Sequence, residues 1–122
     1  MEIRYIELKT GYNDNGPAWI GKVKLSKSGQ TIYFNDKAFK KCRGTYANYY
    51  DIETNDEYWI SNVKKDGTDR HWVGSGKIII DSNILAEYLE ITGQAILNPS
   101  RYEIIDIPEV YPIDRIKQVE NK

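Results

Sequence analysis

The most chemically varied stretch of the chain is residues 58–72, which hold the single histidine of the sequence. Arg70 precedes His71, Trp72 follows it, and Lys65 lies six residues earlier. An imidazole with an ordinary pKa of about 6.5 serves as a general acid or a general base. A neighbouring cation stabilises an anionic transition state. The stretch is therefore compatible with a small metal-independent hydrolase or nuclease that uses His71 with Lys65 or Arg70.

The alternative interpretation gives His71 a structural place in a hairpin, because no partner that would activate it is evident in the sequence. One histidine and one cysteine do not make a zinc site of four ligands, so no metal is expected. The run from Gly74 to Lys77 lacks the first glycine and the Ser/Thr of a phosphate loop. We expect no cofactor, and an enzyme is the less favoured interpretation.

Charge is distributed unevenly along the chain, although the formal net charge is only −1. Residues 20–43 hold seven basic residues and one acidic residue, a net charge of +6, whereas residues 81–122 carry −4. Basic strands with interleaved aromatic rings are typical of small barrels that bind single-stranded nucleic acid. Lysines on exposed strands also simply prevent aggregation. The candidate binding residues are Lys22, Lys24, Lys37, Lys40, Tyr58, Trp59, Arg70, His71 and Trp72.

Short strands separated by turns account for the first two-thirds of the chain. In residues 18–25, Trp19 and Val23 alternate with Lys22 and Lys24, which predicts a half-buried antiparallel strand. Asn35-Asp36 is suited to a two-residue hairpin turn, because both residue types tolerate positive φ. The other expected strands are residues 2–9, 31–34, 37–40, 48–52, 57–63, 69–73, 77–80 and 101–107.

The pattern changes to helical spacing after Asp81-Ser82, either of which would cap a helix over residues 82–92 that Gly93 ends. Residues 113–120 are compatible with a short helix or a frayed end, and residues 108–122 with a loosely packed tail. These elements predict a mainly β fold with minor α. We expect one domain over residues 1–122: a small SH3-like or OB-like antiparallel barrel or roll with one amphipathic helix, or an open sheet.

Several motifs resemble a family of small bacterial proteins without an assigned function. They are GPAWIGKV, SKSGQTIY, NYYDIET, EYWIS and DRHW, and the resemblance covers roughly residues 16–92. Some members carry the label 1-deoxy-D-xylulose-5-phosphate synthase, a large thiamine-diphosphate enzyme. This sequence lacks the Gly-Asp-Gly cofactor motif and shows no βαβ alternation, so we expect no such activity.

The resemblance implies a compact bacterial domain. A cytoplasmic location is expected because Cys42 has no intramolecular disulfide partner and no export signal or membrane span is evident. We expect a non-enzymatic binding module whose ligand is nucleic acid or a protein. The alternatives are the hydrolase that uses His71 and an interaction subunit of a larger assembly. The last predicts an exposed apolar patch at Tyr102, Ile104, Val110 and Tyr111.

Overall fold

The computed structural model describes residues 2–9, 16–69 and 76–121. Within them lie eight strands, two α-helices and one 3-10 turn. The strands are β1 (Glu2–Leu8), β2 (Ala18–Leu25), β3 (Thr31–Phe34), β4 (Lys37–Lys41), β5 (Tyr49–Asp51), β6 (Glu57–Asn62), β7 (Ile78–Asp81) and β8 (Tyr102–Ile105). The helical elements are η1 (Ser82–Ile84), α1 (Leu85–Thr92) and α2 (Ile113–Glu120).

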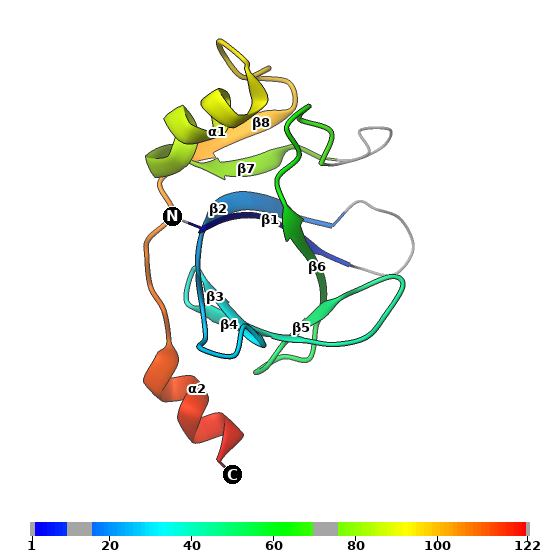
Figure 1. The fold of residues 1–122 in the computed structure, drawn as a ribbon, viewed down its shortest axis with the longest axis vertical. Coiled ribbons are helices and arrows are strands. Elements are labelled where there is room, and N and C mark those ends of the chain that lie inside the picture. The colour runs from blue at the N-terminus through cyan, green and yellow to red at the C-terminus, as the bar shows by residue number, and fades with distance from the viewer. Residues whose placement is uncertain (1, 10–15, 70–75, 122) are drawn as a thin grey trace.

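The first six strands form a closed antiparallel barrel in which consecutive strands are neighbours. Strand β1 pairs with both β2 and β6, and this double pairing closes the ring that Figure 1 shows end on. Closure satisfies the backbone groups that an open sheet would leave at its edges. The predicted small β-barrel with minor α is therefore confirmed, and the open-sheet alternative is wrong.

Local turn chemistry defines the β3–β4 hairpin. Asn35 and Asp36 have φ values of 47° and 62°, as the predicted two-residue turn requires. At the other predicted boundary, Gly93 ends α1 in the left-handed conformation with φ of 69°. Asp81 is the cap at the start of this helical region, and its carboxylate accepts a hydrogen bond from Asn83 N at 3.0 Å.

The barrel interior is filled by side chains that alternate along the strands. Phe34, Phe39 and Tyr58 are buried there with Ile6 and other aliphatic residues. The rings of Phe39 and Tyr58 lie 4.5 Å apart between centroids at an angle of 55°. Gly21 leaves space for this packing, because a Cβ at Gly21 would lie 2.5 Å from the ring of Phe34.

An additional layer, called the outer layer and made of β7, β8 and α1, packs outside the barrel. Strand β7 pairs in parallel with β2, and β8 pairs in parallel with β7. The layer therefore buries the outward-facing Ile20 of β2 completely. The expectation that β2 is buried on one face only is wrong for its first half, because another apolar layer covers the second face.

A different part of the barrel exterior is covered by the chain after β8. Helix α2 lies beside the β3–β4 hairpin (Figure 1). Its Ile116 is fully buried against Tyr33 and Ala38. Residues 113–120 are therefore a packed helix, and the expected single helix is joined by a second one. We call residues 108–121 the C-terminal strap.

Candidate nucleic-acid interface

The proposed hydrolase group cannot be assembled from the described residues. Arg70, His71 and Trp72 all lie outside them, as does most of the strand expected over residues 69–73. Lys65 is exposed in the turn that follows β6. A catalytic role for His71 therefore stays a prediction.

Three of the four predicted binding lysines are paired with acidic side chains. Lys22 Nζ lies 3.1 Å from Glu109 Oε1, and Lys40 Nζ lies 3.0 Å from Glu120 Oε2. Both acids belong to the strap, and their hydrogen bonds raise the pKa of each lysine above its ordinary value. Lys37 Nζ lies 3.7 Å from Asp51 Oδ2. The acidic C-terminal third thus neutralises part of the basic segment.

The predicted aromatic residues do not form an open platform in the described structure. Tyr58 faces the barrel interior, where burial and the nearby Asp51 and Asp56 raise its pKa to about 12. Trp59 is half-buried on the outer face of β6 and packs against the outer-layer cluster. Tyr33 lies beneath α2. All three rings therefore pack against other side chains of the fold.

The other four basic residues of the segment 20–43 lie towards one end of the barrel. We call them the basic end: Lys24, Lys27, Lys41 and Arg43. All four are exposed, and none forms an ion pair within the described part of the chain. A backbone hydrogen bond connects the end of β4 to the turn before β3 here, because Lys41 N donates to Gln30 O at 2.8 Å. An open pocket of about 300 Å³ is lined by Gln30, Lys41, Cys42 and Arg43.

Residue selection from the sequence missed most of the basic end. Lys27, Lys41 and Arg43 belong to the same +6 segment as the predicted lysines. In the structure they lie in turns or at a strand end, where alternation says nothing about side-chain direction. The useful signal is the charge run itself: Asp36 is the only acid in residues 20–43. An exposed ring lies in the loop that follows Arg43, where Tyr46 receives Lys9 Nζ 5.4 Å from its centroid.

Buried carboxylates elsewhere in the protein accept backbone hydrogen bonds and so stabilise the fold. Asp51 Oδ1 accepts hydrogen bonds from Glu53 N at 2.9 Å and Thr54 N at 3.3 Å, which holds the β5–β6 turn. Asp81 Oδ1 also accepts from Ile107 N at 3.3 Å. Within the described ranges, no group of three His, Cys, Asp or Glu side chains is arranged to hold a metal ion.

A second polar region lies over the outer layer. The hydroxyls of Tyr88 and Tyr102 are 3.1 Å apart. Asp69 accepts a hydrogen bond from Lys64 N at 2.8 Å, and burial raises the pKa of this carboxyl group. Its buried Oδ2 has no hydrogen-bond partner among the residues that the structure describes. A pocket of about 200 Å³ beside it is lined by Asp66, Gly67, Thr68, Gln94, Asn98, Arg101 and Tyr102.

The apolar patch expected of an interaction subunit is divided by the fold. Ile104 and Val110 are 51% and 45% exposed, whereas Tyr102 is buried and Tyr111 is half-buried. Among the described residues, no helix is long and apolar enough to cross a membrane.

The fold and the basic end together define a small closed β-barrel with a cationic surface that has no ion-pair partner among the described residues. No family model matches the chain, and searches of curated proteins and of solved structures also give no match. The resemblance to a bacterial family therefore stays a prediction.

Proposed function

We propose that the protein is a non-enzymatic binding module whose basic end binds single-stranded nucleic acid. The observation that carries the proposal is the division of the basic segment. Lys22, Lys37 and Lys40 have acidic partners within the fold. The residues of the basic end have none in the described ranges, so their charges are available to an external anion.

The geometry of the basic end suits a flexible polyanion better than a small anion. Its charges come from a turn, strand ends and a loop, and two of them, Lys41 and Arg43, line an open pocket. A chain of phosphates contacts several separated cations at once, and the release of condensed counterions then favours binding.

Fluorescence anisotropy with labelled oligothymidylate and oligouridylate of about 20 nucleotides tests the proposal. The paired change Lys41→Gln and Arg43→Gln should weaken binding about tenfold at low salt. It should also reduce the salt slope by about 1.4, because two phosphate contacts are lost. The matched control is Lys77→Gln with Lys117→Gln, which removes the same charge from exposed positions elsewhere.

Two results would contradict the proposal. One is the absence of salt-dependent binding by the unmodified protein. The other is an equal loss of affinity in both paired variants, which would show attraction to overall charge alone. Competition by poly-glutamate as strong as that by an oligonucleotide would instead identify an acidic protein as the partner.

A further inference from the structure

The outer face of strands β2 to β5 carries lysines and tyrosines side by side. Lys24 is the register partner of Tyr33, and Lys40 is the register partner of Tyr50. Residues paired across neighbouring strands point to the same side of a sheet, as do residues two apart on one strand. Lys22 therefore lies on the same face as Lys24. Lysines beside aromatic rings on a small barrel are the chemistry of a single-strand platform.

The C-terminal strap covers this face and contacts it through matching chemistry. Glu109 and Glu120 bond to Lys22 and Lys40, residues that lie 87 and 80 positions away in the chain. Between them, Ile116 covers the ring of Tyr33. A carboxylate oxygen accepts from a lysine Nζ as a phosphate oxygen does. The strap thus occupies the donors and the ring that a nucleic acid would use.

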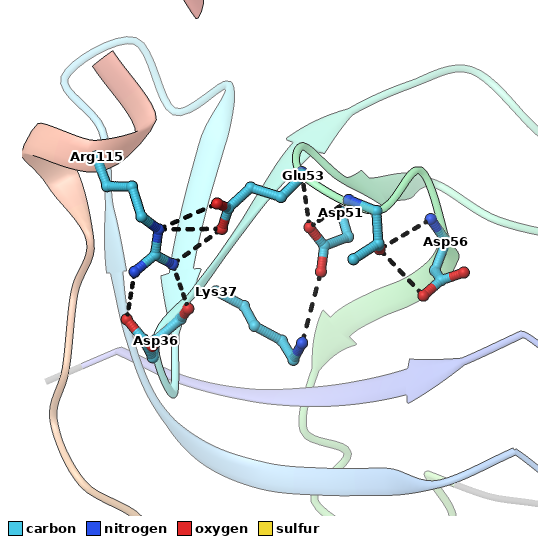
Figure 2. Close-up of polar contacts among 7 residues, drawn as sticks. Asp36, Lys37, Asp51, Glu53, Asp56 and Arg115 are labelled. Atoms are coloured by element: carbon cyan, nitrogen blue, oxygen red, sulfur yellow. Dashed lines mark hydrogen bonds and ion pairs between the residues drawn. The ribbon is translucent and has the colours of Figure 1, made fainter. Parts of the chain in front are cut away.

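Arg115 fastens the strap to two hairpin turns, as Figure 2 shows. Its Nε donates to Glu53 Oε2 at 3.1 Å, and its Nη1 donates to Asp36 Oδ1 at 2.9 Å. Its Nη2 donates to the backbone oxygen of Asp36 at 2.8 Å. Asp36 N in turn donates to Val110 O at 2.8 Å. One side chain on the strap therefore connects it to both the β3–β4 turn and the β5–β6 turn.

The strap is suited to release because most of its attachments face solvent. Pro112 and Ile116 are the only buried residues among the described positions 108–121. All of the ion pairs that fix it involve exposed or half-exposed side chains. Such pairs contribute little to stability and are screened by salt. A ligand that supplies other anions to Lys22 and Lys40 can replace the strap at a small cost.

We propose that the C-terminal strap is an intramolecular competitor of single-stranded nucleic acid, and that the face beneath it is a second part of the nucleic-acid surface. This inference rests on the proposed function. Binding begins at the uncovered basic end, and displacement of the strap adds Lys22, Lys40 and Tyr33 to the contact. The apparent affinity for the whole surface is then the intrinsic affinity multiplied by the fraction of molecules in which the strap is open.

Arg115→Ala in the full chain tests the inference, with Lys117→Ala as the matched control. Both changes remove one positive charge from α2, but only Arg115 forms an ion pair with the barrel in the described structure. Simple electrostatics predicts weaker binding of oligothymidylate by both variants. The inference predicts the opposite for Arg115→Ala: binding on the order of fivefold tighter, with a salt slope steeper by about 1.4 because two more lysines contact phosphate.

A second change distinguishes opening of the strap from other effects. Lys40→Gln should weaken binding severalfold in the Arg115→Ala background and much less in the unmodified protein, where Glu120 occupies that lysine. Hydrogen exchange at α2 monitors opening directly. Faster exchange in Arg115→Ala without tighter binding would overturn the inference.

The outcomes separate this inference from the proposed function. If the paired Lys41 and Arg43 variant loses binding while Arg115→Ala matches Lys117→Ala, the basic end is the nucleic-acid site and the strap is purely structural. If neither the unmodified protein nor Arg115→Ala binds oligonucleotide, both proposals fail. If Arg115→Ala binds poly-glutamate as tightly as oligothymidylate, the covered face is a site for acidic protein segments instead.

Discussion

The C-terminal strap and the outer layer both cover the outside of the barrel, but they are held by different kinds of contact. The strap buries Pro112 and Ile116, accepts one backbone hydrogen bond from Asp36 N and is otherwise held by exposed ion pairs, chiefly those of Arg115 and Lys40. The outer layer relies on full burial of large side chains, with Tyr88 completely enclosed. Charge pairs at a surface are weak and salt-sensitive, whereas apolar burial is strong and insensitive to salt. Of the two covers, the ion-paired strap is therefore the one that can open.

The largest expected effect tests whether the outer layer is part of the stable core. Tyr88→Ala should lower the free energy of unfolding by about 3–5 kcal/mol, because a large ring is removed from a closed site. Tyr88→Phe keeps the ring and loses the polar contacts of the hydroxyl, including the one to Tyr102, at a cost of about 1 kcal/mol. Urea denaturation measures both values. Equal losses in the two variants would show that the hydroxyl contact, not ring burial, holds the layer.

A smaller effect concerns the carboxyl group of Asp69 at the edge of the outer layer. Because burial raises its pKa above the ordinary 3.8, the folded state binds the proton more tightly than the unfolded state. This group therefore lowers stability progressively as the pH rises above 3.8. Asp69→Asn removes the charge and keeps an oxygen to accept from Lys64 N.

The stability of Asp69→Asn relative to the unmodified protein should thus increase with pH, as followed by thermal melts across a pH series. The relative measurement cancels the opposite contributions of the other carboxylates. A relative stability that decreases with pH would show that the ionised carboxylate is favoured by the fold.

The smallest expected effect is that of Arg115→Ala on global stability. The melting temperature should fall by about 2 °C or less at low salt, and the difference should vanish at high salt as the ion pairs are screened. A large, salt-independent decrease would show that the strap belongs to the cooperative core. That result would remove the distinction between the two covers.

Local features of the barrel could be predicted from sequence because they depend on residues near one another in the chain. The Asn35-Asp36 turn follows from backbone preferences, and Gly93 ends its helix for the same reason. Strand β2 has the predicted bounds, Ala18–Leu25. Alternation also placed Trp19 and Val23 on one face, which is the face that packs in the barrel interior.

The binding surface could be predicted only in part. The +6 segment identified the right region, but no local pattern shows that Glu109 lies beside Lys22 or that Glu120 lies beside Lys40. Alternation also gave no sign that Ile20 is covered by a parallel strand, because Lys22 and Lys24 follow it on the same face and make that face read as exposed.

The sequence by itself determined the mainly β class, the hairpin turns and the segregation of charge, since these depend on composition, local dihedral preference and the two-residue repeat of strands. Only the tertiary structure decided which charges are paired, which face of β2 meets solvent and which lysines remain available to a ligand. The physical reason is distance along the chain. Backbone preferences act over a few residues, whereas an ion pair or a buried contact is made by whichever segments the closed barrel brings together.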